Sequence, residues 1–168
     1  MDLIEGLKKR RSIREYKDLS IPDSVIEEII EIAKFAPTAR NLQPWKIVVV
    51  KDKKTKKRIS ELAIKNAPFI DSAPVLLCIF CEDTKYYLED GSSLTTYILL
   101  AAFSKGIGSC WIAGDKKPYC EDIKRLLKVP SKYKLVSMVS LGYPAQGFEK
   151  TINKKELSEI LSWEVFKE

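Results

Sequence analysis

The chain has 168 residues and a mass of 19.2 kDa, and 45% of its residues are hydrophobic, which is enough for one domain with its own core. Lysine and arginine (29) outnumber aspartate and glutamate (23), and the formal net charge of +6 favours anionic partners. Histidine is absent, which excludes Ser-His and Cys-His nucleophilic triads and leaves cysteine and carboxylate as the available zinc ligands. We therefore expect no hydrolase of these types and no metal centre.

The four cysteines are too scattered for the disulfide framework of a small secreted protein, so we expect reduced thiols. Cys78 and Cys81 form a CxxC pattern in an apolar run that is typical of a buried strand. Residues three apart on a strand point to opposite faces, so a shared metal or redox bridge is not expected. The longest apolar run, from Tyr97 to Phe103, is too short to cross the ~30 Å hydrocarbon layer of a bilayer. With no segment resembling a signal peptide, the sequence predicts a cytoplasmic protein without a membrane span.

Periodicity and capping residues predict alternating helices and strands. Asp2 is a plausible N-cap of the first helix, Pro22 and Pro37 bracket the second, and Gly106 is a natural end for the long fourth one. The expected elements are, in chain order, a helix over 3–7, a helix over 22–36, a polar loop over 38–43, a strand over 45–50, a basic helix over 54–64, a strand over 75–80, a helix over 88–105, a strand over 109–112, a helix over 118–127 and a strand over 135–141.

This alternation predicts a layered sandwich of helices and sheet, and the absence of repeats and linkers predicts a single domain, 1–168. We expect the lysines of the helix over 54–64 to form a solvated face. The end of the chain, residues 157–168, carries Trp163 and Phe166, which a compact monomer would expose. We expect this tail to pack across a dimer, with docking on its own core as the alternative.

Three segments carry side chains suited to ligand binding. Residues 10–14, Arg-Arg-Ser-Ile-Arg, combine fixed positive charge, bidentate donors and a hydroxyl, a set suited to a phosphate and a neighbouring polar ring. Residues 37–45 place short hydrogen-bonding side chains in a helix-to-strand loop, and residues 106–114 place small residues where a planar ligand could approach the backbone. Taken alone, residues 10–14 would be read as a basic surface stretch.

Over almost its entire length the sequence resembles the FMN-dependent nitroreductase family in its short, single-domain form. Four blocks in the same order carry the resemblance. They are R-R-S-[IV]-R at Arg10–Arg14; A-P-S/T-x-x-N-x-Q-P-W at Ala36–Trp45; an Asp at Asp90 followed by G-[IL]-G-x-x-W-[IG] at Gly106–Ile112; and G-Y-P-A at Gly142–Ala145.

The resemblance implies an α+β fold, a three-layer α-β-α sandwich around a mixed, mainly antiparallel sheet, with the C-terminal tail packed on a dimer partner. It also implies that Arg10 and Ser12 grip the FMN phosphate and ribityl chain, while Arg14 lies beside the pyrimidine edge of the flavin. A guanidinium there would stabilise the negative charge of the reduced flavin. The alternative for Arg14 is a surface salt bridge with Glu15 or Asp18.

In the family, the loop after the second helix reaches the flavin of the other subunit, and the segment after the long helix lies along the flavin ring, where a backbone amide can tune hydride transfer. Trp111 is alternatively a core residue. The cofactor-binding residues implied by position are Arg10, Arg11, Ser12, Arg14, Pro37, Thr38, Ala39, Asn41, Gln43, Trp111, Ile112, Ala113, Gly114 and Lys154. Lys154 stands where relatives commonly carry an arginine on the phosphate, and Lys150 and Lys155 are alternatives for that contact.

The implied activity is hydride transfer from NADH or NADPH, through FMN in a homodimer, to a nitroaromatic, quinone or similar small-molecule acceptor, without catalytic side chains. Tyr86, Tyr87 and Leu88 fall where the family shapes acceptor choice. Alternatives are an FMN-binding sensor or storage protein, a dehalogenase-like relative, or a flavin-cleaving relative. The basic residues are dispersed and lack an aromatic-interleaved stripe, so no nucleic-acid partner is expected.

Overall fold

The computed structural model describes residues 3–148 and 152–166, and within them four strands form one sheet. The strands are β1 (Trp45–Val50), β2 (Val75–Glu82), β3 (Gly108–Ala113) and β4 (Tyr133–Gly142), in the spatial order β1-β2-β4-β3. All three pairings are antiparallel. The long strands β2 and β4 lie at the centre and are almost entirely buried, so β1 and β3 form the two edges.

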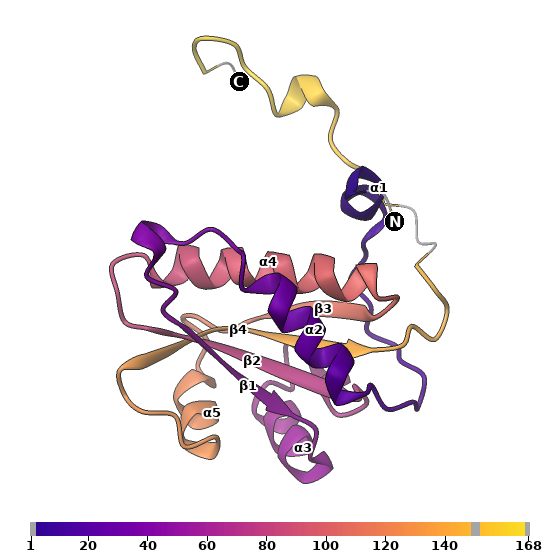
Figure 1. The fold of residues 1–168 in the computed structure, drawn as a ribbon, viewed down its shortest axis with the longest axis vertical. Helices are drawn as coiled ribbons and strands as arrows, with labels where there is room; N and C mark the ends of the chain where they lie inside the picture. The colour runs from indigo at the N-terminus through magenta and orange to yellow at the C-terminus, as the bar shows by residue number, and fades with distance from the viewer. Residues whose placement is uncertain (1–2, 149–151, 167–168) are drawn as a thin grey trace.

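Five α-helices among the described residues complete the layers (Figure 1). They are α1 (Leu3–Lys9), α2 (Asp23–Ala33), α3 (Lys53–Leu62), α4 (Tyr87–Ser104) and α5 (Cys120–Leu126). Helices α2 and α4 cover one face of the sheet, and α3 and α5 cover the other. The three-layer α-β-α sandwich expected from the resemblance is confirmed.

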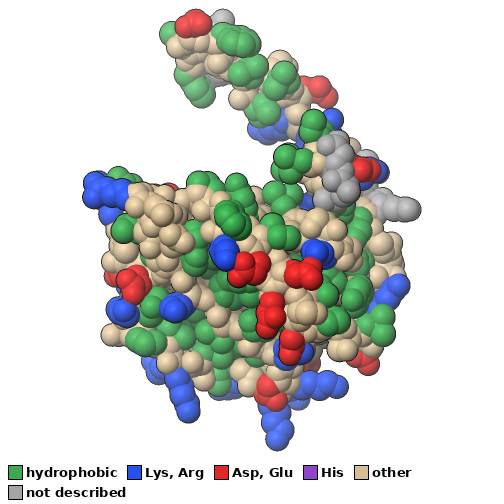
Figure 2. All heavy atoms as spheres, in the orientation of Figure 1, with side chains coloured by type: hydrophobic (Ala, Val, Ile, Leu, Met, Phe, Trp, Pro, Cys, Tyr) green, Lys and Arg blue, Asp and Glu red, His purple; other side chains and the backbone are tan. Residues whose placement is uncertain are grey.

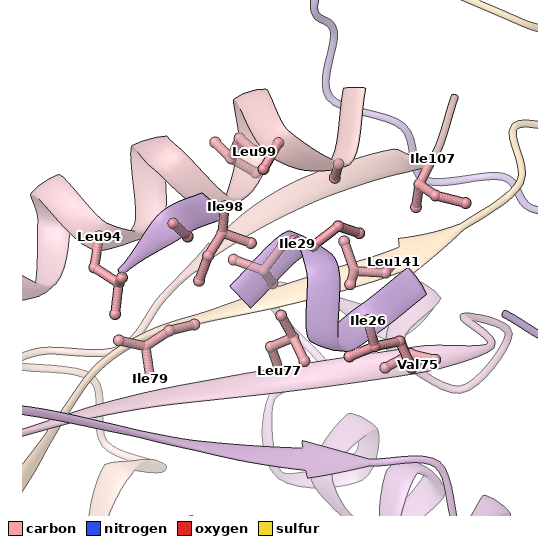
Figure 3. Packing of buried hydrophobic residues seen from close by; sticks show 14 of the residues in the cluster. Ile26, Ile29, Val75, Leu77, Ile79, Leu94, Ile98, Leu99, Ile107 and Leu141 are labelled. Atoms are coloured by element: carbon pink, nitrogen blue, oxygen red, sulfur yellow. The ribbon is translucent and has the colours of Figure 1, made fainter. Parts of the chain in front are cut away.

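Each face of the sheet has its own hydrophobic core, because alternate residues of a strand point to opposite sides. Ile29 of α2 and Ile98 of α4 pack on Leu77 of β2 in the first core, as Figure 3 shows. Cys81 belongs to this core, whereas Cys78 belongs to the core beneath α3 and α5. The CxxC cysteines therefore face opposite sides of β2, as predicted, and burial raises the pKa of each thiol to about 12.

A short extended stretch, residues 10–17, lies along the sheet beside β3. Ser12 pairs with Ser109 in a parallel bridge, and Tyr16 pairs with Pro144 in an antiparallel one. This stretch, which we call the edge segment, runs parallel to β3 at one isolated bridge, outside the antiparallel four-stranded sheet. It also fixes residues 10–14 against the start of β3.

Most predicted elements are found within one to three residues of their expected bounds. Helix α2 ends at Ala33, three residues early, because the residue before Pro37 avoids helical backbone. Short 3-10 turns at Ala39–Asn41 and Pro68–Ile70 were not predicted. Gly106 follows α4 with a positive φ of 72°, the backbone conformation that a helix-ending glycine supplies.

The prediction that the lysines of α3 form a solvated face is wrong for Lys56. Its side chain is buried, and its ammonium donates hydrogen bonds to the carbonyls of Ala73 and Pro74. The ammonium thereby holds the turn that leads into β2. Burial lowers the pKa of Lys56.

The two ends of the described chain project from this body, and hydrophobic side chains lie along them (Figures 1 and 2). Leu3, Ile4 and Leu7 of α1 are all more than half exposed. In the C-terminal segment, residues 152–166, Trp163 is 73% exposed and Phe166 is 87% exposed. The alternative that this tail docks on the chain's own core is therefore wrong for residues 152–166. No helix of the described residues is long and apolar enough to span a membrane.

Candidate functional site

The open edge of β3 offers backbone hydrogen-bonding groups to a ligand. The amide of Gly114 donates to the carbonyl of Val136 on the β4 side at 3.1 Å. Because hydrogen-bonded pairs alternate along an antiparallel ladder, the backbone groups of Trp111 and Ala113 face away from β4. Ser109 shares that direction, and its carbonyl accepts from the amide of Ile13 at 2.9 Å. The edge segment thus covers the start of this edge and leaves Trp111 and Ala113 exposed.

Residues 10–14 bring positive charge to that edge. Arg14 is exposed, and its guanidinium carbon lies 5.7 Å from the centroid of the Phe69 ring. Arg11 instead donates to the carbonyls of Lys8 and Arg10 at 2.6 and 2.9 Å. None of the ion pairs found among the described residues involves Arg10 or Arg14. The alternative that Arg14 forms a surface salt bridge is therefore wrong.

Two residues show how closely the edge segment approaches β3. A Cβ atom on Gly108 would lie 2.9 Å from Cβ of Ile13, a contact closer than packing allows, so glycine is required there. Burial raises the pKa of the Cys110 thiol, and the neighbouring Arg14, Ser12 and Arg10 oppose that rise. The three side chains that the sequence predicted for the phosphate and flavin edge therefore lie around one residue of β3.

A β-bulge at Val136 shapes the end of β3. The register between β2 and β4 shifts here, which lets the carbonyl of Val136 accept from the amides of both Gly114 and Asp115, at 3.1 and 3.2 Å. A Cβ atom on Gly114 would lie 2.7 Å from the backbone of Val136. Of the two backbone amides expected beside a flavin ring, that of Gly114 is thus engaged within the protein, and that of Ala113 faces the open edge.

Side chains that sequence reasoning missed fix the same stretch from α5. The Tyr119 hydroxyl donates to the carbonyl of Ala113, and the Cys120 thiol donates to the carbonyl of Gly114 at 2.6 Å. From α4, the Tyr87 hydroxyl donates to the Asp115 carboxylate at 2.7 Å. The Tyr87 contact spans 28 positions, whereas the Tyr119 and Cys120 contacts each span six and depend on how the chain turns between β3 and α5. Trp111 is 37% exposed, which contradicts the alternative that it is a core residue, whereas Ile112 is buried.

The loop over residues 37–43, which we call the cofactor loop after the role that the resemblance implies for it, has an unusual backbone. Arg40, Asn41 and Gln43 have φ angles of 54°, 55° and 48°, in the left-handed region that residues other than glycine seldom adopt. The Thr38 hydroxyl accepts from the Gln43 amide at 3.2 Å, and the Gln43 side chain donates to Asn41 Oδ1 at 3.1 Å. Strained backbone of this kind is concentrated at functional sites.

The cofactor loop also borders a hollow of about 350 Å³ at the start of α4. Pro37, Thr38 and Ala39 form one side of it. The other side consists of Tyr86, Glu89, Asp90 and Ser93. Tyr86, which the sequence placed where acceptor choice is shaped, is therefore part of this wall.

The structure does not bring all predicted residues together within one chain. The cofactor loop lies at the start of α4, whereas Arg10 to Arg14 lie beside β3, near the end of α4 (Figure 1). The 18 residues of α4 correspond to about 27 Å of helix. Lys154 and Lys155 are exposed on the projecting C-terminal segment, and Lys150 lies outside the described residues.

A basic, backbone-anchored segment beside an open strand edge is suited to binding an anionic ligand. Comparison with known proteins gives the family. The model of the Nitroreductase family matches residues 7–85 and 65–143, and the chain belongs to this family. It is therefore an oxidoreductase by family.

Among similar proteins, a putative NADH dehydrogenase/NAD(P)H nitroreductase of Archaeoglobus fulgidus is 39% identical, with 85% of this chain and 86% of the relative covered. An iodotyrosine deiodinase of Thermotoga neapolitana is 28% identical, covering 84% and 88%. The solved FMN-dependent nitroreductase of Clostridium difficile has a TM-score of 0.85 at 31% identity, covering 97% and 99%.

Proposed function

We propose that this chain is an FMN-dependent oxidoreductase that takes hydride from NADH or NADPH and delivers it to a small acceptor such as a nitroaromatic or a quinone. The observation that carries the proposal is the edge segment, which brings Arg10 and Arg14 to the start of β3, a strand whose outer edge stays open at Trp111 and Ala113. Relatives named NAD(P)H nitroreductase and FMN reductase support the same reaction class.

The residues at the edge fit the chemistry of FMN. Arg10 and Ser12 supply a charged and a hydroxyl donor for a phosphate group, and Arg14 supplies a guanidinium for a polar ring edge. The amide of Ala113 faces outward at the other end of β3, and Gly108 lets the edge segment approach the start of that strand closely. When bound, FMN would accept a hydride from a nicotinamide and pass it to a second substrate.

Arg14 has the main electrostatic role in this proposal. Two-electron reduction leaves negative charge near N1 and O2 of a flavin, so a fixed guanidinium at that edge stabilises the reduced form. Tyr119 and Cys120 donate hydrogen bonds to the backbone carbonyls of Ala113 and Gly114 and limit the movement of this stretch. The chain has no histidine, so we expect protons for the acceptor to come from solvent.

We further propose that the active form is a homodimer in which the cofactor loop of one subunit completes the site of the other. The separation of the loop from Arg10 along α4 supports this arrangement. The exposed apolar side chains of α1 and of residues 152–166 supply surface for a second copy to cover, and the tail is expected to pack on that copy.

Purified protein should be yellow, and anaerobic addition of NADH or NADPH should bleach its flavin absorbance. Subsequent addition of a nitroaromatic or a quinone should restore the colour, because the acceptor reoxidises the flavin. Bleaching with neither donor would contradict the reductase proposal and favour an FMN-binding sensor or storage protein. Colourless protein that takes up no added FMN would contradict the cofactor assignment itself.

Analytical ultracentrifugation tests the dimer. The full chain should sediment as a dimer, and a chain truncated after residue 151 should shift toward monomer and lose FMN affinity, because the apolar tail no longer covers its partner. A monomeric full chain that binds FMN with one equivalent per subunit would contradict a shared site.

A further inference from the structure

Asp90 is a buried carboxylate that reaches from α4 to the cofactor loop. It is 4% exposed, and its Oδ1 accepts a hydrogen bond from the amide of Ala39 at 2.8 Å, across 51 positions of sequence. Its other oxygen, Oδ2, is buried without a hydrogen-bond partner among the described residues. Burying such an oxygen without a hydrogen-bond partner is unfavourable. The buried carboxylate therefore destabilises the fold, and its hydrogen bond to the loop is the interaction that offsets this.

The loop needs an anchor outside itself because its backbone is strained. The hydrogen bonds of Thr38 and Gln43 close the loop on itself and do not fix it to the body. The backbone ties the loop's end to the sheet, where the carbonyl of Pro44 accepts from Glu82. Asp90 fixes the other side, at Ala39, directly before the left-handed Arg40 and Asn41.

The anchor itself is rigid. Asp90 lies in the first turn of α4, where the helix dipole stabilises negative charge. A Cβ atom on the adjacent Gly91 would lie 2.7 Å from the side chain of Val136, so this turn of α4 packs directly on β4. Val136 is also the bulge residue whose carbonyl accepts from Gly114 and Asp115. One packed unit thus connects the loop anchor to the end of β3.

We propose that Asp90 is a positioning residue of the cofactor site: its carboxylate holds the cofactor loop in the binding conformation through the Ala39 amide, without touching the cofactor. This inference rests on the proposed function for the ligand, FMN, but the hold on the loop belongs to the protein alone. It predicts that flavin affinity depends on an acceptor at position 90.

Asp90→Ala removes the acceptor, and Asp90→Asn keeps an oxygen that can accept from Ala39. We expect Asp90→Ala to raise the dissociation constant of FMN about tenfold and Asp90→Asn to stay within about threefold of the parent chain. Thr95→Val is the matched control. Thr95 is buried in the same helix and bonds to Gly91 and Ser137, on the sheet side. Thr95→Val should lower the melting temperature without changing FMN affinity.

Amide hydrogen exchange on the protein without FMN provides a second measurement. In the parent chain, the Ala39 amide should exchange slowly, like the amides of α4, and Asp90→Ala should accelerate exchange across residues 38–43. Rapid exchange of Ala39 in the parent, or equal FMN affinity in Asp90→Ala, would overturn the inference. An equal loss of FMN affinity in Asp90→Asn and Asp90→Ala would also overturn the inference, because the hydrogen bond to Ala39 would then not explain the loss. If the parent chain binds no FMN, the proposed function fails, and exchange still decides whether Asp90 holds the loop.

Discussion

The two segments that carry the candidate site are held in different ways. The edge segment lies in extended backbone and is paired with β3 and with Pro144 through main-chain contacts. The cofactor loop has three residues at positive φ and depends on side chains, those of Thr38, Gln43 and Asp90, for its shape. The exposed arginine Arg14 of the edge segment can therefore change at little structural cost, whereas changes in the loop also alter its conformation.

Arg14→Gln gives the largest effect expected from a side-chain change in the edge segment. The main-chain pairing stays, and the charge beside the flavin edge is lost. Because a charge-assisted hydrogen bond contributes about 1.5–3 kcal/mol, we expect FMN affinity to fall about 10- to 100-fold. Turnover should fall as well, together with a lower flavin redox potential, measured by anaerobic titration.

Arg11→Gln is the matched control, because Arg11 is turned back onto the carbonyls of Lys8 and Arg10. It should alter the potential less than Arg14→Gln does. An unchanged flavin redox potential in Arg14→Gln would show that Arg14 does not stabilise the reduced flavin.

Gly108→Ala disturbs the main-chain pairing of the edge segment with β3 and leaves the charge of Arg14 unchanged. The added Cβ would lie 2.9 Å from Ile13, so either the edge segment moves out or the side chain of Ile13 moves. Overpacking of this kind costs about 1–3 kcal/mol, and we expect FMN affinity to fall about tenfold. Calorimetry measures the loss of stability, and flavin fluorescence measures the loss of FMN affinity. Gly108→Ala combined with Ile13→Gly, which also removes the contacting Cβ, should regain affinity, and failure to regain it would show that the close approach is not what holds the segment.

The sequence predicted the strands well because each is a β-branched or apolar run between clear breakers. It predicted residues 10–14 as a unit because charge, hydroxyl and order along the chain are local properties. It did not predict Asp90 as a support, because its partner Ala39 is 51 positions away. It did not predict Tyr119 or Cys120 either, because their partners six positions back are reached only through the way the chain turns between β3 and α5. Lys56 was misassigned for a related reason: its carbonyl partners belong to a turn 17 residues further along the chain.

Glycine substitutions should change the free energy of unfolding in opposite directions in the two segments. Arg40→Gly relieves a residue at φ 54°, and we expect the free energy of unfolding to rise by about 0.5–1 kcal/mol. Glu15→Gly, in the extended edge segment, should lower it by a similar amount, because glycine loses more conformational freedom on folding. A change of 1 kcal/mol corresponds to about 2–4 °C in melting temperature for a chain of this size. The same sign at both positions would contradict the contrast between the segments.

The smallest expected effect concerns the phosphate contact from the tail, which belongs to neither segment. Lys154 stands where the resemblance implies an arginine, and it keeps that charge but lacks the planar fork that binds a phosphate through two hydrogen bonds. Lys154→Arg should tighten FMN binding about threefold, the range of an exposed ion pair, and the gain should disappear at high salt. Lys155→Arg is the control, because it makes the same chemical change one residue along an exposed segment. If Lys155→Arg gives the gain and Lys154→Arg does not, the phosphate contact belongs to Lys155 and not to Lys154.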